Sequence, residues 1–133
     1  MEQFQYLIDT NALIDYLGKK LPITGMDFLN NVIDAVPCVS VITKIEVLGF
    51  NSSKESTQLL TDFMNDANVF DLTNDIVTAT INIRKKHKIK LPDAIIAATA
   101  LIKNSILISR NLADFKNIAG LNTVDPHTIT KNQ

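Results

Sequence analysis

Hydrophobic positions along the chain alternate between short continuous apolar runs and longer stretches with helical spacing. Three runs are short enough to be strands buried on both faces, at 4–9, 38–41 and 106–109. The stretches with helical spacing predict helices at 12–20, 25–36, 53–67, 74–88 and 92–104, and a further helical stretch follows the 38–41 run. Two weaker runs, 68–72 and 121–125, fit edge strands. Strands that alternate with helices predict an α/β fold, a three-layer α/β/α sandwich on a mostly parallel sheet.

Length and composition fit one domain over residues 1–133, with a polar tail that we expect to fray after about residue 127. Of the 133 residues, 46% are hydrophobic and 20% are charged, which is enough apolar material for a three-layer core. The formal net charge is −1, so any nucleic-acid binding would have to use a local basic patch.

Cys38 is the only cysteine, which excludes an intramolecular disulfide and a cysteine cluster for zinc. The first apolar run begins too close to Met1 to leave room for a signal peptide, and no later run is long enough to cross a membrane. We therefore expect a soluble, cytoplasmic protein. The four glycines form neither a phosphate-binding Walker loop nor a dinucleotide-binding motif.

Four acidic residues fall at the ends of predicted elements. Asp9 ends the first strand, Glu46 lies in the helical stretch after the 38–41 strand, Asp93 opens a helix, and Asp114 lies in the loop after the 106–109 strand. In an open parallel sheet, sites form outside the carboxyl ends of the strands. This architecture could bring all four carboxylates to one rim.

A shared acidic pocket would need a compensating cation, because neighbouring carboxylates repel one another and resist ionisation. Carboxylate and water oxygens suit Mg²⁺ or Mn²⁺, and a phosphate group often completes such a coordination sphere. The combination is typical of phosphodiester hydrolysis assisted by metal ions.

Each of these acids also fits a simpler structural role. The run "DTN" at 9–11 contains three good helix N-cap types, and Asp93 is favoured by the helix dipole whether or not it binds a ligand. Glu46 could face solvent, and Asp114 could be an ordinary turn residue. Spacing alone leaves both interpretations open.

Basic residues gather at 84–90, at the end of a predicted helix, where they complement the helix dipole. Arg110 is the better candidate for binding a substrate phosphate, because it lies at the predicted rim. His87 and His127 have no partners at metal-binding spacing, and we expect them on the surface or in the tail.

Several of these segments together resemble a known family. "YLIDTNALIDYL", "SVITKIEVLGF", "LPDAIIAATAL" and "ILISRNLADF" are similar, in this order, to segments of the PIN domains, in particular the VapC-type ribonuclease toxins of bacterial toxin-antitoxin pairs. The resemblance implies a PIN fold and a metal-dependent endoribonuclease that cuts structured RNA such as tRNA or rRNA. It also implies a homodimer, and a cognate antitoxin whose tail blocks the acidic site.

Carried over by position, the resemblance implies a set of site residues. The implied metal-binding and catalytic acids are Asp9, Glu46, Asp93 and Asp114. The polar positions expected to orient carboxylates or water around them are Thr10, Asn11 and Ser109. Many relatives carry an acid where this chain has Asn111, which is therefore a candidate weak ligand or supporting group.

Two rival functions stay open at this level. The chain could be a PIN module that binds RNA or a partner protein without useful catalysis, as the asparagine at position 111 would permit. It could also use the same metal on a different substrate, as a DNA nuclease or a small phosphatase.

Overall fold

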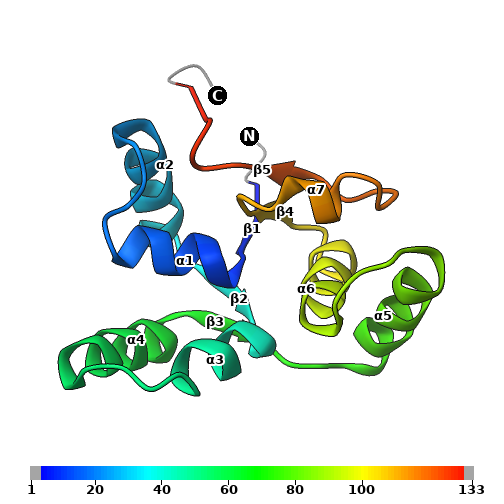
Figure 1. Cartoon of the computed structure of the whole chain (residues 1–133), viewed down its shortest axis with the longest axis horizontal. Coiled ribbons are helices and arrows are strands. Elements are labelled where there is room, and N and C mark those ends of the chain that lie inside the picture. The colour runs from blue at the N-terminus through cyan, green and yellow to red at the C-terminus, as the bar shows by residue number, and fades with distance from the viewer. Residues whose placement is uncertain (1–3, 131–133) are drawn as a thin grey trace.

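The computed structural model describes residues 4–130 as five parallel strands alternating with helices (Figure 1). The strands are β1 (Tyr6–Ile8), β2 (Cys38–Ser40), β3 (Asn68–Phe70), β4 (Ile106–Ile108) and β5 (Thr123–Val124). Their order in the sheet is β3-β2-β1-β4-β5. The two weaker runs form β3 and β5, and their predicted edge positions are confirmed.

Helices cover both faces of this sheet, with α1 to α4 on one side and α5 and α6 on the other (Figure 1). The helices are α1 (Thr10–Leu17), α2 (Ile23–Asp34), α3 (Val41–Leu48), α4 (Lys54–Asp66), α5 (Asn74–Lys86), α6 (Leu91–Ile102) and α7 (Leu112–Phe115). The predicted α/β/α sandwich is confirmed. One difference is α7, a short helix in a region expected to be a loop.

The two halves of the core follow from the alternation of side chains along each strand. Leu7 and Leu107 pack with α5 and α6, whereas Ile8 and Ile108 pack with α1 and α2. Because both faces of the strands are covered, the strands read as continuous apolar runs and not as alternating ones. The β1–β4 register pairs Ile8 with Ile108, so the carboxyl ends of these two strands finish side by side.

Small side chains hold α6 against the sheet. Its buried residues include four alanines, each at most 1% exposed: Ala94, Ala97, Ala98 and Ala100. This fixes the position of the first turn of α6, which carries Asp93. No helix within residues 4–130 has both the length and the apolar character needed to span a membrane.

The C-terminal segment lies against α2 at Pro126, just before the point near residue 127 after which the tail was expected to fray. Ile129 is buried, and a Cβ placed on Gly25 would lie 2.0 Å from the backbone oxygen of Pro126. Residues 131–133, the rest of the expected frayed tail, lie outside the described residues.

Gly25→Ala should therefore destabilise the protein by roughly 1–3 kcal/mol, because the new methyl group meets backbone atoms that cannot turn aside. Helix propensity alone would predict a gain of about 1 kcal/mol. The measurement is urea unfolding monitored by circular dichroism. The control is Asn31→Ala, which changes an exposed residue of the same helix. A Gly25→Ala protein as stable as the wild type would contradict this close packing.

Candidate active site

The four acidic residues come from separate segments and lie at the carboxyl edge of the sheet. Asp9 follows β1, Glu46 lies on α3 after β2, Asp93 is in the first turn of α6, and Asp114 lies on α7 after β4. Glu46 acts electrostatically on both Asp9 and Asp93, and Asp114 acts on Asp93. The structure therefore brings together the residues that the sequence placed at the ends of elements.

Asp9 is both the N-cap of α1 and the most buried of the four acids. Asp9 is buried, with 3% of its surface exposed to solvent. Oδ1 accepts the Thr10 backbone N–H at 2.8 Å, and Oδ2 accepts the Ser109 hydroxyl at 2.8 Å. Because both oxygens are held, the carboxylate plane is fixed, and the capping role and the site role coexist.

Burial raises the pKa of Asp9 from 3.8 to about 6. The hydrogen bonds from Ser109 and Thr10 oppose this rise by stabilising the charged form, and repulsion from Asp93 and Glu46 adds to it. The charged form of Asp9 is thus poorly compensated by the protein itself.

Asp93 has no such hydrogen bonds. Within the described part of the chain, no donor reaches its partly buried carboxylate, so it does not cap α6 through its side chain. Burial raises its pKa, with repulsion from Asp114 and Glu46 acting in the same direction and Lys90 opposing it. A carboxylate that accepts no hydrogen bond and lies among other carboxylates has the surroundings of a cation ligand.

Glu46 is exposed but not free in orientation. The Thr10 hydroxyl donates to its Oε1 at 2.7 Å, and the oxygen of that hydroxyl lies 3.0 Å from the hydroxyl of Thr43. Thr43 is fully buried and was missed in the sequence, although it lies three residues before Glu46 and so on the same face of α3. The pair of threonines ties α1 to α3 beside the acids.

Asn111 and Ser109 connect Asp114 with Asp9. The Asn111 side-chain amide donates to Asp114 Oδ2 at 2.6 Å, and the Asn111 backbone N–H donates to the Ser109 hydroxyl oxygen at 3.0 Å. Asn11 differs from these residues, because it is exposed on the first turn of α1 and none of the hydrogen bonds within residues 4–130 joins it to a site carboxylate.

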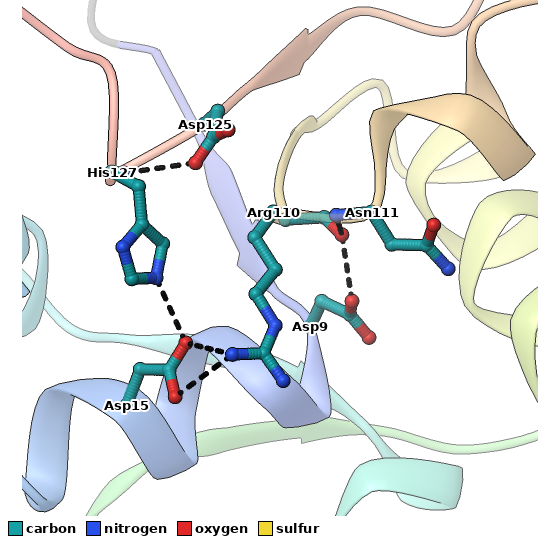
Figure 2. Close-up of polar contacts among 7 residues, drawn as sticks. Asp9, Asp15, Arg110, Asn111, Asp125 and His127 are labelled. Atoms are coloured by element: carbon teal, nitrogen blue, oxygen red, sulfur yellow. Dashed lines mark hydrogen bonds and ion pairs between the residues drawn. The ribbon is translucent and has the colours of Figure 1, made fainter. Parts of the chain in front are cut away.

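Arg110 reaches a carboxylate that the sequence did not single out. Its Nη1 lies 3.0 Å from Asp15 Oδ2, on α1, and the same oxygen lies 2.9 Å from His127 Nε2 (Figure 2). His127 lies in the C-terminal segment with its side chain 32% exposed, as expected, and its contact with Asp15 was not indicated by the sequence. The basic residues Arg84, Lys85 and Lys86 form the last turn of α5, as predicted.

The donors present suit a hard divalent cation. All four acids supply carboxylate oxygens, and their mutual repulsion is what such a cation would relieve. In residues 4–130, no group of three or more His, Cys, Asp or Glu side chains is arranged so that it could hold a metal ion. Since like charges keep apart, binding would require these carboxylates to turn towards the ion. The residues fit Mg²⁺ or Mn²⁺ by donor chemistry.

Fold and site together define an α/β protein with an acidic site at the carboxyl edge of a five-stranded parallel sheet. The PIN domain model matches residues 6–121, and the chain belongs to the PIN domain family. The predicted family is confirmed. No curated protein sequence matches the chain.

Solved structures with the same fold include chains of several toxin-antitoxin complexes. A chain of a toxin-antitoxin complex from Klebsiella pneumoniae is 31% identical, with a TM-score of 0.73 and coverage of 93% of this chain and 99% of that one. A chain of VapBC-1 from nontypeable Haemophilus influenzae is 25% identical, with a TM-score of 0.73 and coverage of 91% and 97%. A chain of DNA-bound VapBC from Salmonella typhimurium is 22% identical, with a TM-score of 0.76 and coverage of 93% and 99%, which supports the fold.

Proposed function

We propose that this PIN domain protein is a metal-dependent endoribonuclease and the toxin of a toxin-antitoxin pair. The proposal is supported by four acids from four segments that lie at one edge of the sheet and act on one another electrostatically, with Asp9 and Asp93 in surroundings that disfavour their charge. The similarity to a chain of a toxin-antitoxin complex at 31% identity supports the biological context.

In this proposal, Asp9 and Asp93 are the primary ligands of Mg²⁺ or Mn²⁺. A bound divalent ion supplies a water of lowered pKa and stabilises charge on the phosphoryl and leaving oxygens. Asp9 contributes a carboxylate already oriented by Ser109 and by the Thr10 backbone. Glu46, held by the Thr10 hydroxyl, helps fix the metal or orients the attacking water. Asp114 completes the pocket.

Polar neighbours support these four catalytic acids. Thr10 and Ser109 orient Glu46 and Asp9, and Asn111 orients Asp114. Asn11 is exposed, and its proposed role is to contact water or substrate at the start of α1. Arg110 keeps half of its side chain exposed while Nη1 contacts Asp15, so the remaining guanidinium N–H groups can bind a substrate phosphate.

The proposed partners are RNA, a cognate antitoxin and a second copy of the chain. Structured RNA such as tRNA or rRNA is the proposed substrate class, and the cytoplasm is the proposed location. The antitoxin is supported by the complexes in which similar folds occur. Light scattering of the purified protein would test the homodimer.

Cleavage of a mixed tRNA and rRNA pool should occur with Mn²⁺ and stop when EDTA removes the metal, because the acidic site then repels the substrate phosphate and holds no water of lowered pKa. The measurement is fragment formation on denaturing gels. Single-stranded DNA and a simple phosphomonoester, assayed in parallel, distinguish a DNA nuclease or a phosphatase. Undiminished RNA cleavage in EDTA would contradict the proposal.

A second candidate is a noncatalytic PIN module that binds RNA or a partner protein. It is favoured by Asn111, which supplies a neutral amide where an acid would add a ligand, and by the lack of a preformed ligand set in the described residues. This candidate predicts RNA binding without turnover in Mn²⁺.

A further inference from the structure

A second buried carboxylate lies beside the acidic site but does not belong to it. Asp15 is 4% exposed and lies on α1, six residues after Asp9. Arg110 Nη1 lies 3.0 Å from its Oδ2 and 3.4 Å from its Oδ1. His127 Nε2 lies 2.9 Å from Oδ2 (Figure 2). A buried carboxylate needs such partners, and here both come from distant parts of the chain.

Arg110 is the middle residue of the turn that serves the acidic site. Ser109, on one side, donates to Asp9, and Asn111, on the other, donates to Asp114. In Figure 2 the Arg110 side chain extends towards Asp15, whereas the Asn111 side chain points in a different direction. The turn is therefore attached to α1 at two places, through Ser109 at the helix start and through Arg110 at its second turn.

His127 joins the C-terminal segment to the same carboxylate. Its backbone N–H donates to Asp125 Oδ1 at 2.8 Å, which holds the segment in a turn. The neighbouring Pro126 lies directly against Gly25 of α2. Because Pro126 fixes the segment against α2, the backbone of the neighbouring His127 is held in place where its side chain contacts Asp15.

We propose that Asp15, Arg110 and His127 form a clasp that positions Ser109 and Asn111 against the carboxylates of the acidic site. Asp15 is then a positioning residue, since it acts on the site through Arg110 and touches no reacting group. The effect on metal binding rests on the proposed function; the effect on the 109–111 turn does not.

The alternative is an ion pair that stabilises the fold alone. Ordering the half-exposed Arg110 costs conformational entropy of its side chain and of the turn that carries it. The ion pair with the buried Asp15 opposes this entropy cost. Groups that hold a ligand carboxylate typically change metal affinity roughly 10–100-fold when removed. An ion pair that only stabilises the fold changes the midpoint of unfolding and leaves the affinity of the folded protein unchanged.

The test compares Asp15→Asn and Arg110→Gln with the wild type by two measurements made without RNA. Mn²⁺ titration should show dissociation constants raised roughly 10–100-fold in both variants. Amide hydrogen exchange by NMR, without metal, should be at least about tenfold faster at Asn111, whose N–H is bonded to Ser109. Without RNA present, loss of a phosphate contact by Arg110 does not alter either result.

Three further variants sharpen the comparison. Arg110→Lys should recover part of the Mn²⁺ affinity, because it keeps a cation for Asp15. His127→Gln should speed exchange in the C-terminal segment and change Mn²⁺ affinity less than Arg110→Gln does. Asp27→Asn removes an exposed carboxylate on α2 and should match the wild type in both measurements. If Asp15→Asn fails to fold, the half-exposed Arg110 supplies the decisive variants.

The clasp is overturned if the wild type binds Mn²⁺ and the folded variants bind it equally well. A wild type that binds no Mn²⁺ would instead count against the proposed function. Exchange at Asn111 then decides the clasp by itself: faster exchange in the variants supports it, and unchanged exchange overturns it.

Discussion

Asp93→Asn is expected to lower RNA cleavage by a factor on the order of 10³ and, at the same time, to make the metal-free protein harder to unfold. The two effects have one cause. The Asp93 carboxylate is partly buried, is repelled by Asp114 and Glu46, and accepts no hydrogen bond from any residue between 4 and 130. Its negative charge is therefore unfavourable in the metal-free protein and becomes favourable when it binds a cation.

Thermal unfolding gives the second measurement for this variant. Without metal, Asp93→Asn should raise the midpoint, by roughly 3 °C for each kcal/mol of repulsion relieved. With Mn²⁺, the stabilisation seen in the wild type should shrink, because ligand binding to the native state is what produces it. A lower metal-free midpoint together with an unchanged Mn²⁺ shift would show that Asp93 stabilises the start of α6 and does not bind a metal.

Asp75→Asn is the matched control. Asp75 lies in the first turn of α5, as Asp93 lies in the first turn of α6, so both substitutions remove one negative charge from a helix start. Asp75→Asn should leave cleavage and the Mn²⁺ shift unchanged and should lower stability slightly.

The second large effect concerns the pH dependence of stability, which Asp9 should dominate in the metal-free protein. Its pKa is raised from 3.8 to about 6, so the folded state binds the proton more tightly than the unfolded state does. The resulting stabilisation is fully present below the unfolded pKa and is lost as pH rises through about 6. A shift of this size corresponds to about 3 kcal/mol.

Urea unfolding in EDTA, between about pH 4 and about pH 8, measures this dependence. The chain has no tryptophan, so circular dichroism is the suitable signal. Asp9→Asn should remove most of the fall in stability between these limits, because an amide does not titrate. The comparison uses the change with pH and not the absolute stability, since the amide also alters the contact with Ser109. The exposed Asp27→Asn should keep the wild-type dependence; a similar dependence in Asp9→Asn would contradict the assignment.

The alternation of elements was readable in the sequence because it depends on local spacing. Apolar runs such as 106–109 mark buried strands, and stretches such as 74–88 mark amphipathic helices, wherever they lie in the final structure. The short α7 was missed, because its four residues are too few to show a helical period. The close contact of Pro126 with Gly25 was not predicted either, since the polar composition of the C-terminal segment gives no sign of it.

The candidate site divides in the same way. Asp9, Glu46, Asp93 and Asp114 could be chosen from the sequence because each follows a strand or opens a helix, and the carboxyl edge of a parallel sheet gathers such positions. The sequence by itself therefore determined the class of fold, the family resemblance and the acids worth testing.

Only the tertiary structure decided which polar groups meet. Asp9 and Ser109 are 100 residues apart, Asp15 and Arg110 are 95 apart, and Asp15 and His127 are 112 apart. These contacts depend on β4 pairing with β1 and on the C-terminal segment returning across α2, neither of which is specified by local periodicity. Which distant segments pair is decided by the free energy of the whole packed core. A local pattern of hydrophobic and polar residues therefore does not predict these contacts.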